Sequence, residues 1–370
     1  MSFLCFKNHY PNRNFNLLVF IAFFSCLVLF PAGADMPLKG EVREIIDDFN
    51  GFEFREADEK LSSFDKAYPH SFYTPFLHSY KQYWRFLLAP YHESVAEELQ
   101  RKVEETIDLC EREEFDSSGE AKLIKGCAYV FLSALIFEGG RPLASLKWLN
   151  KGIQEVKSLE TDPELKGDVA FILGSYQLYR VIRDTDKALA LLETARKEGV
   201  YFTALARLVT ARIYQRGQED AEKSLPIYRE LNREYPNNPL VSYYLAKNLQ
   251  MTRQYRESIE TFEKTLSIIN FDPPPLEMLC LIHFSSGQIY ENVVRSGRDA
   301  AREYLAAYNL ADRAVEETTW FIPWSSLHLG MVYAKMNDRE TALQWLNKVE
   351  KNDDRRAWEK AARLIRDLSP

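Results

Sequence analysis

The stretch Leu329-Gly330-Met331-Val332-Tyr333, followed nine residues later by Ala342, decides the fold of this chain. The small residue Gly330 follows an apolar one, and Tyr333 lies three residues further on. Ala342 and Leu346 are then four residues apart in a second helical window. Residues three and four apart share one face of a helix. The pattern therefore predicts a hairpin in which small residues let two antiparallel helices approach closely, while bulky residues fill the space between hairpins.

The same pattern recurs towards the N-terminus with a fixed period. Ser224 and Ser258 are 34 residues apart, and so are Tyr228 and Phe262. A period of this length indicates a helical repeat. Other units keep fewer positions, and one of them carries about one inserted residue in its turn: Gly287, Tyr290, Ala300, Tyr304 and Ala307.

The period and the pattern resemble the tetratricopeptide repeat (TPR) superfamily, and Tyr235-Pro236-Asn237-Asn238-Pro239 resembles the linker between its units. The resemblance implies an all-α fold, a right-handed superhelical solenoid of antiparallel helix pairs. We expect about seven pairs within residues 35–353, clearest over 205–352, and a C-terminal capping helix at 354–370. The order of units is similar to that of exported bacterial TPR proteins of uncharacterised role.

The N-terminus has the pattern of a secretory signal. Lys7 and Arg13 precede a run of fourteen residues, 17–30, that is apolar except for Ser25, and Pro31-Ala32-Gly33-Ala34 follows. A membrane span needs about 20 apolar residues, so we expect export to the periplasm or cell envelope with cleavage after Ala34. Retention of residues 17–30 as an anchor and lipoprotein processing at Cys26 are the alternatives.

Charge argues for a protein partner and against nucleic acid. Without residues 1–34 the chain has 45 basic and 54 acidic residues, a net charge of −9, which does not suit a polyanionic partner. Residues 93–120 carry a net charge of −8 and residues 196–256 a net charge of +5. Either segment is a solvated outer face of helices, or the basic one forms a groove for an acidic peptide.

In TPR proteins the first helix of each unit lines a concave groove, so the resemblance implies a set of partner-binding residues. The positions combine aromatic and polar side chains, as a peptide groove does. The aromatic ones could equally pack against adjacent helices. The residues are Phe171, Tyr179, Arg212, Arg216, Tyr243, Lys247, Gln250, Phe284, Gln288, Asn292 and Lys335.

Signals of chemistry are weak. The sequence contains no nucleophile, phosphate-loop or metal motif, so we expect no catalytic residue, metal or cofactor. Cys110 and Cys127 fall on opposite arms of one expected hairpin, and a disulfide between them is possible in an oxidising compartment. The favoured function is a non-enzymatic binding scaffold. The alternative is an enzyme or regulatory subunit with a site in the irregular aromatic segment 68–92.

Overall fold

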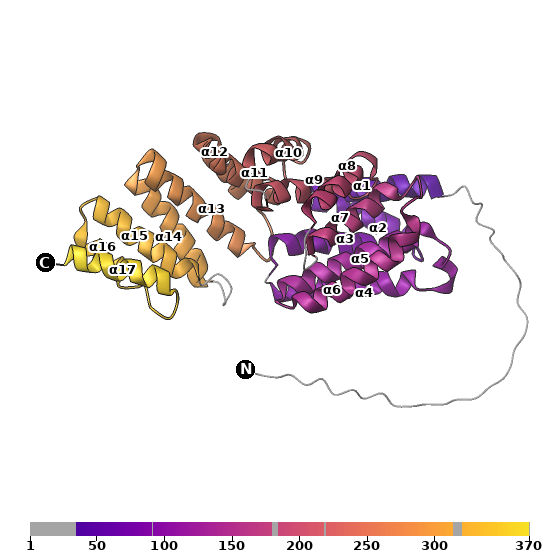
Figure 1. Cartoon of the computed structure of the whole chain (residues 1–370), viewed down its shortest axis with the longest axis horizontal. Coiled ribbons are helices and arrows are strands. Elements are labelled where there is room, and N and C mark those ends of the chain that lie inside the picture. Colours follow the sequence, from indigo (N-terminus) through magenta and orange to yellow (C-terminus); the bar gives the residue numbers. More distant parts are fainter. Residues whose placement is uncertain (1–34, 91, 180–183, 218–219, 314–319, 370) are drawn as a thin grey trace, which may run out of the picture.

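The computed structural model describes residues 35–369 except 91, 180–183, 218–219 and 314–319, and all regular structure in these residues is helical (Figure 1). None of the described helices is long and apolar enough to cross a membrane. The α-helices are α1 (Asp35–Gly51), α2 (Phe54–Ala67), α3 (Tyr73–Leu88), α4 (Glu93–Cys110), α5 (Gly119–Glu138), α6 (Pro142–Val156), α7 (Lys166–Tyr179), α8 (Thr185–Glu198), α9 (Thr203–Arg212), α10 (Ala221–Glu234), α11 (Pro239–Met251), α12 (Tyr255–Ile268), α13 (Leu276–Ile289), α14 (Gly297–Arg313), α15 (Phe321–Lys335), α16 (Arg339–Leu346) and α17 (Arg355–Leu368).

Successive helices pack as hairpins, from α1–α2 to α15–α16, and α17 follows the last of them (Figure 1). The described residues thus contain eight helix pairs, one more than the seven expected. α17 contacts both α15 and α16. Its residues Ala357 and Ala361 are buried in one cluster with Leu327 and Leu346, so α17 covers the apolar end of the array.

The small residues of the repeat let the two helices of a pair come into contact. A methyl group added at Gly330 would lie 2.5 Å from Cγ of Leu346, and one added at Gly287 would lie 2.8 Å from the ring of Tyr304. Carbon atoms do not approach this closely. The packing that the sequence pattern predicts is therefore present in both units.

The turn inside each pair often uses one residue in the left-handed region. Phe52, Arg253, Arg295 and Asn337 have φ between 60° and 62°, and Gly140 has φ 74°. Glycine and asparagine adopt this conformation at little cost, whereas phenylalanine and arginine do so less readily. The turn geometry is thus shared by units whose sequences differ at this position.

Two first helices end in a π-helical turn, η3 (Ile213–Gly217) after α9 and η4 (Tyr290–Val294) after α13. In units without a π-helical turn, a backbone hydrogen bond joins an amide after the helix to the carbonyl five residues earlier, as from Asp338 to Tyr333. After η4 the corresponding bond spans six residues, from the Ser296 amide to the Tyr290 carbonyl. An extra residue in a helix is commonly absorbed as a π-turn, which accounts for the residue inserted near Tyr290.

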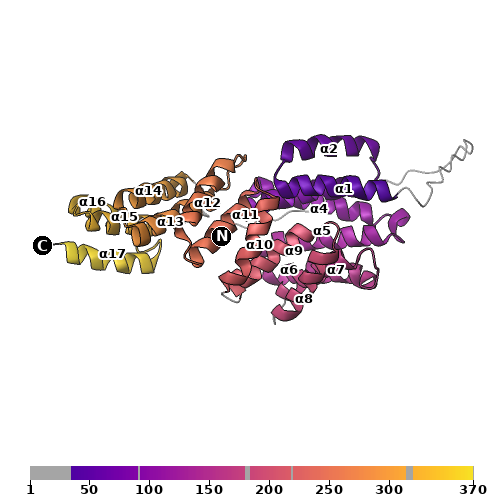
Figure 2. The ribbon, with the colours of Figure 1, turned by 90° about the horizontal axis from the view of Figure 1, so that it is seen from above.

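Helix α3 is buried on most of its surface. It contacts both the first hairpin, α1–α2, and α5, which lies below that hairpin in Figure 2. Phe76 and Tyr80 pack against Phe131 of α5 and against Phe202, which precedes α9, with ring centroids 6.1–6.5 Å apart. Aromatic pairs at such distances stabilise a core beyond the area they bury. Helix α3 therefore packs against α5 and against the segment that precedes α9.

A buried asparagine joins the first hairpin to the middle of the array. Asn50, at the end of α1, accepts hydrogen bonds from the Tyr80 hydroxyl (2.8 Å) and the Trp84 indole (3.2 Å) at its side-chain oxygen. Its backbone carbonyl accepts one from the Asn238 amide, 188 positions away (2.8 Å). Arg85 likewise donates to the Asp272 carbonyl, before α13 (2.7 Å). The N-terminal half is thus closed on itself, whereas α13 to α17 continue as an open array (Figure 1).

Candidate functional site

The aromatic members of the predicted groove belong to the core. Phe171, Tyr243 and Phe284 are 3%, 7% and 9% exposed. Phe171 packs on Phe202 with ring centroids 5.2 Å apart, and Tyr243 packs on Phe262 at 6.3 Å. Burial of this kind serves packing between adjacent helices, which is the alternative that the sequence left open.

The polar members keep access to solvent. Arg212, Lys247, Gln250 and Gln288 are partly buried, and Asn292 and Lys335 are exposed. They come from the C-terminal parts of four successive first helices, α9, α11, α13 with η4, and α15. The side chains of Tyr179 and Arg216 lie outside the described residues. We call the six described polar residues the concave strip.

Two basic residues occupy the strip on neighbouring helices. The Arg212 guanidinium lies over the ring of Tyr244 on α11, 5.0 Å from its centroid. The Lys247 ammonium donates to Oε1 of Gln250 (2.8 Å) and to Oγ of Ser285 on α13 (3.2 Å). Both acceptors are neutral, and burial lowers the pKa of Lys247 to about 8. An ammonium has three protons to donate, so one remains for a further acceptor.

Lys335, in contrast, belongs to an ionic cluster around the buried carboxylate of Glu291. The Glu291 carboxylate lies 2.6 Å from the Lys335 ammonium and accepts a hydrogen bond from the Tyr304 hydroxyl at 2.9 Å. Nδ1 of His328 is 2.9 Å from the same carboxylate. Burial acts to raise the pKa of Glu291, but the hydrogen bonds from His328, Lys335 and Tyr304 hold it at about 2. Glu291 is therefore a fixed negative charge that neutralises this end of the strip.

Sequence reasoning missed this cluster, although a repeated pair signals it. Tyr304 follows Glu291 by thirteen residues, and Tyr228 follows Gln215 by the same number. In both units the tyrosine of the second helix donates to a buried acceptor in the preceding π-turn, at 3.0 Å for Gln215. The π-turn thus aims one polar side chain into the hairpin, where only a hydrogen-bonded group is stable.

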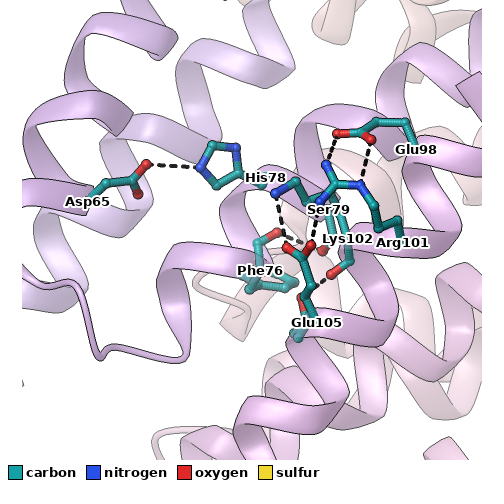
Figure 3. A network of polar contacts seen from close by, with 9 residues as sticks. Asp65, Phe76, His78, Ser79, Glu98, Arg101, Lys102 and Glu105 are labelled. Carbon is teal, nitrogen blue, oxygen red and sulfur yellow. Dashed lines mark hydrogen bonds and ion pairs between the residues drawn. The ribbon is translucent and has the colours of Figure 1, made fainter.

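The acidic segment 93–120 forms an outer face. On α4 the Glu98, Arg101, Lys102 and Glu105 side chains form a chain of ion pairs, with Arg101 Nε 2.9 Å from Glu98 and Lys102 3.0 Å from Glu105 (Figure 3). Arg101 lowers the pKa of Glu98 through its hydrogen bond. Pairs of this kind three and four residues apart stabilise a solvated helix slightly. Two of the six acids of α4, Glu98 and Glu105, are therefore paired with bases of the same helix.

The aromatic side chains of α3, in segment 68–92, serve packing. Tyr73, Phe76, Tyr80 and Trp84 are at most 1% exposed. At the end of α3 a small hollow is lined by one titratable side chain, that of Arg85, and otherwise by apolar residues: Leu88, Ala89, Val95, Phe271 and Pro273. General acid–base chemistry needs convergent titratable groups, and this hollow does not provide them.

The possible disulfide is not formed. Cys110 and Cys127 are free, buried thiols. Burial raises the pKa of Cys110 to about 12 and also raises that of Cys127, so both stay protonated and unreactive. Among the described residues, no group of three or more His, Cys, Asp and Glu side chains is placed to hold a metal ion.

Comparison with known proteins identifies the fold. No protein-family model and no curated protein matches the sequence. The structure is similar to human IFIT1, solved as a dimer with PPP-AAAA, at 16% identity and a TM-score of 0.50, covering 85% of this chain and 69% of that one. It is also similar to the APC/C hetero-tetramer Cut9–Hcn1, at 13% identity and a TM-score of 0.54, covering 86% of this chain and 59% of that one.

The structure is therefore an all-helical array of antiparallel helix pairs, as the sequence predicts. The two similar structures are no more than 16% identical to this chain. Their identities are too low to transfer an activity, because one fold can carry many functions.

Proposed function

We propose that this protein is a non-enzymatic scaffold that binds a protein partner through the concave strip on α9 to α15. The observation that carries the proposal is the row of six polar side chains on four successive first helices, all of them partly or fully exposed. The first helix α3 is, in contrast, buried on most of its surface and offers no comparable strip.

The chemistry of the strip favours an acidic partner. Lys247 meets no carboxylate among the described residues, and it has one proton without an acceptor. A carboxylate brought to it would gain a charge-assisted hydrogen bond. A nucleic acid is disfavoured because the chain has a formal net charge of −7, whereas nucleic-acid surfaces neutralise phosphates with clustered cations.

The proposal is tested by site-specific photo-cross-linking in the native host. A photoreactive residue placed at Gln288, in the strip, should yield a protein adduct, and one at Arg101, on the outer face of α4, should not. Charge reversal at Arg212→Glu with Lys247→Glu should abolish the Gln288 adduct while circular dichroism stays unchanged. Raising the salt should act in the same direction, because exposed charges are screened within about 8 Å at physiological ionic strength. A Gln288 adduct that survives the double charge reversal refutes an acidic partner. Equal adducts at Gln288 and Arg101 refute the concave strip as the binding surface.

We further propose that the scaffold works outside the cytoplasm, in the periplasm or cell envelope. The support is the charge and length pattern of residues 1–34, which lie outside the described part of the chain. N-terminal sequencing of the protein from its host should give Asp35 as the first residue. Recovery of intact Met1 in the membrane fraction would favour an anchor instead.

A further inference from the structure

A row of exposed apolar side chains marks the turns of three consecutive repeats. Of the eight large apolar side chains that are exposed among the described residues, half lie where α11, η4 and α15 end. These are Met251, Val293, Val294 and Met336, between 42% and 52% exposed. We call them the turn ridge. Such grouping matters because apolar residues scattered singly on a surface need no explanation, but grouped ones mark interaction sites.

The last two of these turns are in contact with each other. Met336 lies against Gly297 of the preceding unit, so closely that a methyl group at Gly297 would be 2.8 Å from its sulfur atom. The thioether thus rests on the backbone of the neighbouring turn. Methionine is well suited to an adaptable contact surface, because its chain is flexible and polarizable.

Arginine borders the ridge at positions where it is strained. Arg253 and Arg295 take the left-handed conformation in two of these turns, with φ of 60° and 61°. Glycine would adopt it without the steric cost that a side chain brings. Asn337 fills the equivalent position of the third turn. Residues held in unfavourable backbone conformations cluster at functional sites, so the two guanidinium groups are candidates for a role in binding.

The cations of the ridge lack acidic partners of their own. Arg253 and Arg295 are exposed and form no ion pair with any described residue. Arg256 and Arg302, on the second helices that follow these turns, do pair with acids, at 2.9 Å and 3.0 Å. The acids nearest the ridge are engaged elsewhere: Glu291 with Lys335, Asp299 with Arg302, and Asp338 with the Thr341 amide.

We infer that the turn ridge is a docking surface for an acidic amphipathic segment of a partner protein. The apolar side chains of this partner segment would cover the methionine and valine side chains of the ridge, and the carboxylates of the segment would pair with Arg253 and Arg295. Charge complementarity argues for this occupant, because a basic segment would leave both guanidinium groups unneutralised and mutually repelled. The ridge lies on the edge formed by the turns, so this inference does not require binding in the concave strip.

The test is a selection from a display library of random twenty-residue peptides against the purified protein. We expect enriched peptides with a net negative charge and apolar residues three or four apart. By fluorescence anisotropy they should bind the triple variant Met251→Asp, Val294→Asp, Met336→Asp at least tenfold more weakly. The inference is overturned if no peptide is enriched, if the enriched peptides are neutral or basic, or if the triple variant binds them equally well.

A second variant separates binding from folding. Replacing both strained residues, Arg253→Gly with Arg295→Gly, should raise the melting temperature by relieving the left-handed strain and yet weaken peptide binding at least tenfold. The matched control is Arg363→Gln with Arg366→Gln, which removes two exposed charges from α17 and should change affinity less than twofold. Equal losses in the two double variants would show an effect of net charge alone and refute the ridge.

Discussion

Replacing Asn50 with alanine should destabilise the N-terminal half far more than the small size of the change suggests. Asn50 is 1% exposed, and Tyr80 and Trp84, which donate to it, are 0% and 1% exposed. In Asn50→Ala both donors stay buried without an acceptor. Each buried group left unpaired costs about 1–3 kcal/mol, so the expected loss in the free energy of unfolding is about 2–6 kcal/mol.

The assay is urea unfolding followed by circular dichroism, with hydrogen exchange to locate the change. Exchange should accelerate in α1 and α3 and stay constant in α15, which lies in the other half of the molecule. Tyr80→Phe is the matched control, because it removes one donor while Asn50 keeps its bond to Trp84. We expect it to cost about 0.5–1.5 kcal/mol.

The double variant Asn50→Ala with Tyr80→Phe decides the reasoning. It removes one of the two orphaned donors, so it should be less destabilised than the sum of the single variants, by about 1–2 kcal/mol. Strictly additive losses, or a loss below about 1 kcal/mol for Asn50→Ala, would show that these hydrogen bonds do not hold the hairpin in place.

Two further predictions concern other parts of the fold. Deleting residues 354–370 should expose Leu327, Leu346 and Val349. Burial of each large apolar side chain contributes about 1.5–3 kcal/mol to stability, so the melting temperature should fall and dye binding to apolar surface should rise. Deletion of Ser369 and Pro370 alone should change neither. Asp168 accepts hydrogen bonds from the Val200, Tyr201 and Phe202 amides at 2.9–3.0 Å, yet burial raises its pKa from 3.8 to about 6. A raised folded-state pKa means that the folded protein binds the proton more tightly, so this group's contribution to stability falls as pH rises from about 4 to 6. Relative to Asp168→Asn, the wild type should therefore lose about 2–3 kcal/mol across that range in urea titrations, and a pH-independent difference would contradict the raised pKa.

The fold could be predicted from the sequence because small and bulky residues recur at positions that only a helical hairpin explains. Gly330 with Leu346 and Gly287 with Tyr304 meet as the pattern requires. The structure has eight helix pairs among the described residues, where the sequence predicts about seven. Several turns share a left-handed residue that the sequence does not reveal, because Phe52, Arg253 and Arg295 occupy positions where glycine or asparagine is typical.

The candidate site could be predicted only in part. Helical spacing shows which residues share a face, but not what covers that face. Phe171 and Tyr243 are buried by neighbouring packing. Phe131 and Phe202 are covered by rings of α3, a segment 43 or more residues earlier in the chain. The ionic cluster of Glu291 depends on a π-turn and on His328 from the next repeat, which no local pattern specifies.

The hydrogen bond between Asn50 and Asn238 separates two parts of the molecule that we expect to unfold differently. A linear repeat array opens from its ends, because each unit contacts only its neighbours. The C-terminal array is of this kind, so pulling or heating should detach α17 and then release hairpins one after another. The N-terminal half contains a contact across 188 positions of sequence, and long-range contacts of this kind make folding slow and cooperative. One chain therefore combines a part that loosens stepwise, which carries the C-terminal portions of both proposed binding surfaces, with a part that opens as a whole or not at all.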